Sequence, residues 1–157
     1  MRIFKLEEEF WLPRGIEDVF RFFADATNLE LITPPWLRFK IETPCPISMR
    51  ANTLIDYRLK LHGIPIRWQS RISLWDPPHR FVDEQTRGPY RLWIHEHCFE
   101  EQSSGTLCRD NVQYAHLGGS LVNRMLVEPD VSAIFAYRAE KLRQVFGHSS
   151  RCAPESG

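Results

Sequence analysis

Two histidines, His95 and His97, lie two residues apart in residues 90–100, a segment whose alternating side chains predict a β-strand. Side chains two apart on a strand point to the same face, so both imidazoles share one face. Asp83 and Asp110 lie in the strands predicted before and after this one. Imidazoles and carboxylates can transfer protons or ligate a transition metal, so the first question is whether strand register brings these four together.

The turn after this strand sets its register against the next one. A four-residue turn at residues 102–105 opposes His97 to Asp110 and His95 to Val112. A register shifted by one residue would mix apolar and charged side chains on both faces. The same register predicts the pairs Trp93–Tyr114 and Phe99–Cys108, and it leaves Arg109, Asn111 and Gln113 on the solvated face.

The preceding hairpin, which turns at residues 88–89, needs an even register to keep Phe81 on the same face as Trp93. Asp83 and Gln85 then point to that face as well. Five polar side chains therefore share one otherwise aromatic face of the predicted sheet: Asp83, Gln85, His95, His97 and Asp110.

These five polar groups must bond one another, water or a ligand, because a buried polar group without a partner costs ~1–3 kcal/mol. In one interpretation Asp83–His95 and His97–Asp110 are structural pairs that fix the register of the strands. In the other they form the polar end of an otherwise apolar pocket, which is how ligand sites are generally built. The two interpretations are compatible, since a paired cluster can present its free atoms to a ligand.

Three kinds of catalysis are open to this face. A metal site of two histidines and one carboxylate lacks a convincing complete ligand set, because position 99 is phenylalanine and no HExxH motif occurs, so we expect no metal and no cofactor. Acid–base chemistry by a His–Asp pair is more plausible. Nucleophilic catalysis is weakest, since Cys108 opposite Phe99 is most simply a small buried hydrophobic residue.

The elements that must position these residues follow from the rest of the pattern. An opening strand precedes two short helices over residues 16–23 and 28–32, and six further strands then run from residue 36 to residue 115, the first of them over 36–43. Tight turns join nearly all the strands, which indicates one antiparallel sheet. After Pro129, apolar residues recur at helical spacing for over four turns, with Arg138 on the same stripe. The order predicts an α+β fold in which a curved seven-stranded sheet wraps around a long C-terminal helix.

This order, together with the blocks FVDEQTRGPYRLWIHEHCFE (81–100), TPPWLRFKI (33–41) and IFAYR (134–138), resembles the helix-grip fold of the SRPBCC superfamily. That superfamily includes START domains, polyketide cyclases and birch-pollen allergens, and the blocks look like its bacterial "ligand-binding SRPBCC domain" proteins. The resemblance implies a cavity between sheet and helix that holds a hydrophobic or amphipathic small molecule such as a lipid, quinone or polyketide. Its aromatase and cyclase members imply the enzyme alternative, a cyclase or dehydratase that uses His95, His97, Asp83 and Asp110.

Nineteen aromatic residues in a 157-residue chain favour a lined cavity, although a third possibility is a non-catalytic interaction module whose cavity is filled by its own Trp and Phe side chains. The long helix offers Ile134, Phe135, Arg138 and Leu142 as the cover of such a space. The predicted ligand-binding residues are Tyr57, Trp68, Phe81, Asp83, Gln85, Trp93, His95, His97, Phe99, Asp110, Tyr114, Phe135 and Arg138.

Composition bounds the remaining possibilities. One domain over residues 1–147 fits the length, and the small polar residues 148–157 predict a disordered tail. Twenty basic and twenty acidic residues leave no net charge to attract nucleic acid. No apolar run reaches the ~20 residues of a transmembrane helix, and the N-terminal segment has three glutamates where a signal peptide is apolar, so we expect a cytoplasmic protein. Nothing in the sequence identifies a protein partner.

Overall fold

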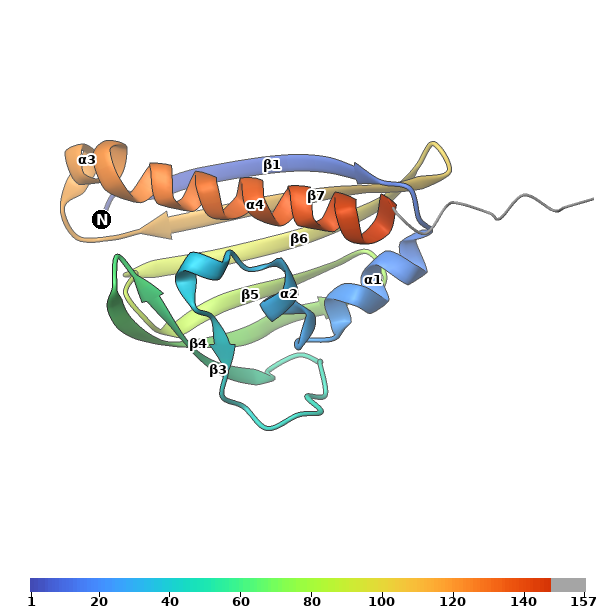
Figure 1. Ribbon diagram of the computed structural model, residues 1–157, viewed down its shortest axis with the longest axis horizontal. Coiled ribbons are helices and arrows are strands. Elements are labelled where there is room, and N and C mark those ends of the chain that lie inside the picture. Colours follow the sequence, from blue (N-terminus) through green and yellow to red (C-terminus); the bar gives the residue numbers. More distant parts are fainter. Residues whose placement is uncertain (148–157) are drawn as a thin grey trace, which may run out of the picture.

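The computed structural model describes residues 1–147, so the tail predicted over residues 148–157 lies outside the described residues (Figure 1). In chain order the elements are β1 (Phe4–Leu12), α1 (Ile16–Ala24), α2 (Asn28–Ile32), the 3-10 helix η1 (Pro35–Leu37), β2 (Lys40–Ile41), β3 (Leu54–Leu61), β4 (Ile64–Asp76), β5 (Arg80–Arg87), β6 (Leu92–Gln102), β7 (Gly105–Ala115), α3 (Gly119–Val122), the π-helical segment η2 (Asn123–Val127) and α4 (Glu128–Gly147).

The seven strands form one antiparallel sheet in the order β1-β7-β6-β5-β4-β3-β2. Helix α4 runs along β1 and β7, and α1 and α2 lie over the remaining part of the same face (Figure 1). This is the helix-grip arrangement predicted from the sequence. The register between β6 and β7 is also the predicted one, with His97 opposite Asp110 and Trp93 opposite Tyr114.

Helix α1 forms because its apolar residues recur on one face. Ile16, Val19, Phe20 and Phe23 are its buried residues, at the spacing that the sequence predicts. Phe20 packs against the sheet through an edge-on contact with Phe99 on β6, at a centroid distance of 5.6 Å. This packing fixes the start of the segment that covers the sheet between α1 and β2.

Helix α4 buries one stripe against the sheet, and Pro129 lies in its first turn, where a missing N–H leaves no bond unmade. The stripe is apolar apart from one arginine, which is only 8% exposed. The buried residues of the helix are Val131, Phe135, Arg138, Ala139, Leu142 and Phe146.

The strand predicted over residues 36–43 is wrong in most of its length. Pro35–Leu37 forms a 3-10 helix, Arg38 has a left-handed backbone with φ of 46°, and strand pairing is confined to Lys40 and Ile41. The two prolines before Trp36 fix a turn rather than an extended entry, so the alternation of side chains here does not reflect a strand. After the turn, this segment lies over the concave face of the sheet, where Leu37 and Phe39 line the cavity described below.

No helix within residues 1–147 is long and apolar enough to cross a membrane.

Candidate functional site

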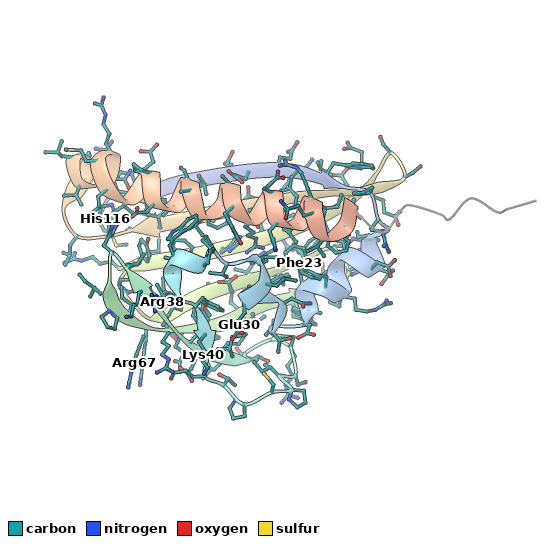
Figure 2. All side chains as sticks on the ribbon, viewed as in Figure 1. Phe23, Glu30, Arg38, Lys40, Arg67 and His116 are labelled. Carbon is teal, nitrogen blue, oxygen red and sulfur yellow. The ribbon has the colours of Figure 1, made fainter. Side chains whose placement is uncertain are left out.

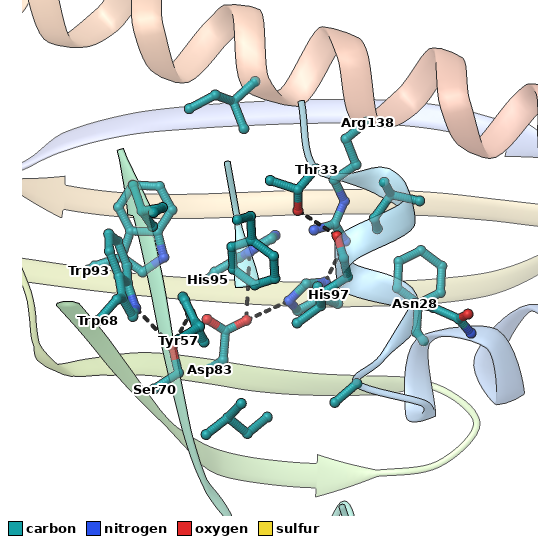
Figure 3. A pocket seen from close by; sticks show the side chains of 18 of the residues that line it. Asn28, Thr33, Tyr57, Trp68, Ser70, Asp83, Trp93, His95, His97 and Arg138 are labelled. Carbon is teal, nitrogen blue, oxygen red and sulfur yellow. Dashed lines mark hydrogen bonds and ion pairs between the residues drawn. The ribbon is translucent and has the colours of Figure 1, made fainter. Parts of the chain in front are cut away.

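A cavity of about 170 Å³ lies between the concave face of the sheet, helix α4 and the segment from α1 to η1. Its wall is mostly apolar, and four of its polar side chains, Asp83, His95, His97 and Arg138, form a cluster in its middle (Figure 3). The volume is similar to that of engineered apolar cavities of about 150 Å³ that bind benzene, and below the ~300–1,000 Å³ of most ligand pockets. As it stands, the cavity therefore accommodates a small molecule of one or two fused rings.

One end of the cavity is an aromatic wall built by β3, β4 and β6. Tyr57 stacks on Trp68 at a centroid distance of 6.1 Å, and Trp68 meets Trp93 edge-on at 5.3 Å. Phe39 and Tyr90 extend this wall at 4.8 Å from Tyr57 and Trp93, respectively. Flat rings on three strands form a slot that suits a planar apolar group.

The opposite end of the cavity is lined by side chains from the covering segment. Phe22 and Phe23 come from α1, Leu29 and Ile32 from α2, and Phe81 closes this end from β5. Figure 2 shows Phe23 between α1 and α4. The covering segment also adds Asp25, Asn28 and Thr33 to the wall, and the rings and aliphatic side chains between them suit an apolar ring or chain.

The polar groups lie between the two ends, on β5, β6 and β7. His95 Nε2 donates to Asp110 Oδ1 at 2.8 Å, and His97 Nε2 lies 2.7 Å from Asp83 Oδ2. The hydrogen bonds are thus diagonal, whereas the sequence predicted the directly opposed pairs Asp83–His95 and His97–Asp110. The opposed atoms are farther apart, at 3.6 Å and 3.5 Å. Register places the side chains correctly, but the rotamers select the diagonal partners.

Arg138 reaches this cluster from α4 (Figure 3). Its Nη2 donates to His97 Nδ1 at 3.1 Å and lies 3.6 Å from Asp110 Oδ1. Its guanidinium also lies over the ring of Phe23, at 5.3 Å from the centroid. Arg138 is therefore the partner of a buried acid, and its guanidinium stays inside the fold.

The bond from Arg138 determines the tautomer of His97. Because Nδ1 accepts, the proton of the neutral ring sits on Nε2 and is donated to Asp83. Burial, with His95 and the Arg138 guanidinium nearby, holds the pKa of His97 well below its usual range. His97 is therefore a neutral link between a cation and a carboxyl group.

The pKa values of the two carboxyl groups shift in opposite directions. Burial raises the pKa of Asp83 above its usual value, although His95 and Arg138 oppose this shift. Burial acts on Asp110 as well, but Arg138 and the bond from His95 outweigh it, so the pKa of Asp110 lies below its usual value. Two carboxyls whose environments separate their pKa values can divide acid–base roles, and Asp83 is the one that lines the cavity.

Ser70 is a polar wall residue that the sequence analysis missed. Its Oγ accepts a bond from Trp68 Nε1 at 3.0 Å and shares a second with Tyr57 Oη at 2.6 Å. The serine thereby fixes both rings of the aromatic wall. Its position on the inward face of β4, next to Trp68 and Ile72, was the available signal.

Not all the predicted ligand-binding residues line the cavity. Gln85 instead bonds the backbone of Tyr90 across the β5–β6 turn, and Asp110 lies behind the histidines. Phe99 belongs to the core around α1, and Tyr114 to a second core cluster with Val131. The predicted residues that do line the cavity are Tyr57, Trp68, Phe81, Asp83, Trp93, His95, His97, Phe135 and Arg138.

The largest set of wall residues missed from the sequence comes from residues 22–39. Most of these side chains lie in the short helices α2 and η1 and in the turns beside them, which offer too few positions for an inward face to be assigned. Thr33 shows this, since it bonds the backbone of Leu29 and also lines the cavity. Phe23 was predicted on the buried face of α1, but as core.

Asp83, His95 and His97 also place three metal-ligating atoms within 4.8 Å of one another. A metal bound through His97 Nε2 would move the ring proton to Nδ1, where the donor Arg138 Nη2 lies at 3.1 Å. Two donors would then face each other beside a guanidinium charge. The surroundings of this trio therefore disfavour a cation.

Solved structures with the same fold include proteins of very different sources. The Zhui aromatase/cyclase from Streptomyces sp. R1128 is 14% identical over 98% of this chain and 99% of its own, with a TM-score of 0.75. The protein TTHA0849 from Thermus thermophilus is 19% identical, covering 93% and 99%, with a TM-score of 0.69. The major latex-like protein 151 of Panax ginseng is 8% identical, covering 92% and 97%, with a TM-score of 0.68. At these identities the likeness shows the fold.

A search of curated proteins found no match to the sequence. The sequence profile of one family, described as polyketide cyclase / dehydrase and lipid transport, matches residues 12–142. This range contains the covering segment, the cavity strands and most of α4. The chain therefore belongs to the polyketide cyclase / dehydrase and lipid transport family of the SRPBCC superfamily.

Proposed function

We propose that this protein binds a hydrophobic or amphipathic small molecule, of the lipid, quinone or polyketide kind, in the cavity between the sheet and α4. The observation that carries the proposal is the position of the polar cluster between two apolar ends. A ligand with one polar group, flanked by a flat ring on one side and an apolar ring or chain on the other, matches this order.

Several wall atoms support the proposal because their hydrogen-bonding capacity is unused. Both interactions of the Asp83 carboxyl go through Oδ2, so within residues 1–147 its Oδ1 has no partner. Tyr90 Oη and Trp93 Nε1 likewise have no hydrogen-bond partner among the described residues, and both side chains line the cavity. Free donors and acceptors on an apolar wall are what a ligand's hydroxyl or carbonyl group would use.

The proposal is tested with 2-naphthol, a flat apolar ring system with one hydroxyl group, titrated by isothermal calorimetry. We expect one binding site per chain. Ile55→Phe places extra volume inside the cavity wall and should weaken binding about tenfold or more. Leu54→Phe, its exposed neighbour on β3, is the matched control and should leave binding unchanged. Equal affinity in both variants would place the naphthol outside the cavity.

Native mass spectrometry of the purified protein then identifies the class of molecule that the cavity takes from the cell. Absence of any co-purifying molecule, together with no naphthol binding, would contradict the proposed function and favour the interaction module.

Acid–base catalysis is a second candidate, and the raised pKa of Asp83 favours it. A carboxyl with a raised pKa can hold a proton at a cavity wall and give it to a leaving hydroxyl group, which departs as water; the carboxylate left behind can then take the proton from the neighbouring carbon as the double bond forms. His97 holds Oδ2 of this carboxyl in place. The co-purified molecule from Asp83→Asn should then be heavier by one water than the molecule from the wild type. Identical masses would favour binding without catalysis.

A further inference from the structure

One end of the molecule contains the start of the chain, the β3–β4 hairpin, the β5–β6 turn and residues 116–130, which run from the end of β7 through α3 and η2 into α4 (Figure 1). Direct contacts join these segments. Arg2 Nη1 donates to Ser120 Oγ at 2.6 Å, and His62 Nε2 at the hairpin tip lies 2.7 Å from Asp130 Oδ2 near the start of α4. Figure 2 shows His116 at the same end. These segments therefore form one continuous surface.

Exposed apolar side chains are concentrated on this surface, which we name the apolar end. Among the described residues, twelve large apolar side chains are exposed, and eight of them belong to these segments, with exposed fractions from 37% to 76%. Large exposed apolar patches on soluble domains mark interaction sites. The eight residues are Met1, Ile3, Ile64, Leu117, Leu121, Val122, Met125 and Leu126.

The first turns of the C-terminal helical region explain the density of this patch. Helix α3 has no buried residue, and in η2 the one fully buried residue is Asn123, whose Oδ1 lies 3.1 Å from His116 Nε2. Residues 119–127 thus point one polar side chain inward and most of their apolar side chains outward. This is the reverse of a helix that covers a core.

The charge of the apolar end differs from that of the whole chain. Its segments hold five exposed cations and two carboxylates, and one carboxylate, Asp130, is paired with His62. The formal charge of the full sequence is zero, so the cations are enriched here. The five cations are Arg2, Lys60, Arg87, Arg91 and Arg124.

We propose that the apolar end docks on the surface of an anionic phospholipid bilayer. Apolar side chains flanked by arginines are the composition of segments that lie in the headgroup region, where anionic lipids attract the cations. A second copy of the chain fits less well. A two-fold contact through the same patch would bring its five cations against those of the partner.

The apolar end lies next to the aromatic end of the cavity. Leu61, Tyr90 and Ile134 belong to the cavity wall and lie next to the hairpin tip, the β5–β6 turn and the start of α4. Docking would therefore bring the aromatic end of the cavity close to the lipid. The docking itself does not rest on the proposed ligand, because it is measured with lipid vesicles and protein alone.

The test is co-sedimentation with vesicles of phosphatidylcholine containing about a third phosphatidylglycerol. Wild type should bind, and binding should fall steeply in high salt and on vesicles of pure phosphatidylcholine. Leu121→Asp with Met125→Asp changes two exposed side chains, at 69% and 72% exposure, and should reduce binding about tenfold or more. Leu31→Asp with Leu54→Asp, exposed elsewhere at 44% and 47%, is the matched control and should bind like wild type.

Two outcomes would overturn the inference. One is equal binding, or equal lack of binding, by wild type and the Leu121/Met125 variant. The other is a concentration-dependent dimer, seen by light scattering, that the Leu121/Met125 variant abolishes while wild type ignores the vesicles. Urea unfolding of both variants at wild-type stability shows that the fold is intact and keeps this test separate from that of the cavity.

Discussion

Arg138 Nη2 on the C-terminal helix donates to His97 Nδ1 in the middle of the sheet, at 3.1 Å. This one bond joins the two layers of the fold across the cavity and fixes the proton of His97 on Nε2, facing Asp83. The polar cluster is consequently a chain from the Arg138 cation through a neutral imidazole to the Asp83 carboxyl group, and Arg138 connects this chain to the His95–Asp110 pair. Its behaviour on mutation and with pH follows from that order.

The neutral His97 should make stability depend on pH. Its lowered pKa means that below about pH 6.5 the unfolded chain takes up a proton that the native state does not. The free energy of unfolding therefore falls as the pH falls, by at most ~1.4 kcal/mol per pH unit from this group. His97→Gln keeps one donor and one acceptor but cannot titrate. Between pH 7 and pH 5 its free energy of unfolding should therefore fall by ~1–2 kcal/mol less than that of the wild type.

Asp83 acts in the opposite sense, since its raised pKa gives stability that is lost as the pH rises through that pKa. The comparison of variants at each pH, by urea unfolding, removes this shared contribution. His79→Gln, an exposed histidine in the β4–β5 turn, should keep the wild-type profile. A His97→Gln profile parallel to wild type would show that His97 is not held neutral.

Arg138 should stabilise the fold through its charge. Arg138→Met keeps an apolar stem but leaves Asp110 buried without its cation, and breaking such a pair costs ~3–5 kcal/mol. Arg138→Lys keeps the charge and loses the planar fork, so its loss should be smaller, ~1–2 kcal/mol. Urea unfolding at pH 7 measures both. Arg143→Met, at an exposed position on the same helix, is the control and should keep wild-type stability. Equal stability of Arg138→Met and Arg138→Lys would refute the role of charge.

The sequence was sufficient for the register of the cluster but not for its bonding. The turn at residues 102–105 and the alternation along β6 and β7 leave one register that separates apolar from charged faces, and the structure has it. Directly opposed and diagonal neighbours are both within reach of imidazole and carboxylate side chains. The choice between them depends on rotamers and on Arg138, a residue forty-one positions beyond His97. A local pattern does not contain that information.

The wall formed by residues 22–39 was lost for a different reason. Its side chains reach the cavity because the short helices fold back over the sheet. The prolines before Trp36 turn the chain across the face of the sheet, so that it does not continue as a strand. By contrast, the long helix α4 repeats its apolar stripe over enough turns to be predicted with its buried face. The wall contributed by α4 was predicted because this helix is long enough for its apolar stripe to repeat, whereas most of the wall contributed by residues 22–39 was not.

Gln85 should prove structural, although the sequence placed it among the ligand-binding residues. Its Nε2 donates to Tyr90 O at 2.7 Å and its Oε1 accepts from Tyr90 N at 3.2 Å, which clamps the β5–β6 turn. Gln85→Ala should cost ~1–3 kcal/mol in urea unfolding and change naphthol affinity less than about threefold. Gln113→Ala, exposed on β7, should alter neither. A tenfold loss of affinity at wild-type stability would return Gln85 to the ligand site.

The trio of Asp83, His95 and His97 should hold no stoichiometric transition metal. Binding through His97 Nε2 requires the tautomer that sets Nδ1–H against Arg138 Nη2, and it also breaks the 2.7 Å bond to Asp83. Elemental analysis should find well below one zinc or iron per chain, and added zinc should not raise the melting temperature, since a ligand that binds the native state stabilises it.

Arg138→Met sharpens this test, because it removes the donor and the charge that oppose a cation while His95, His97 and Asp83 remain. If Arg138 is what excludes the metal, zinc should raise the melting temperature of Arg138→Met and leave wild type unchanged. Adding His95→Ala to that variant removes one of the three ligands and should abolish the effect. One ion per chain in wild type, lost in His95→Ala, would show that the guanidinium does not exclude a metal and would make this cluster a metal centre.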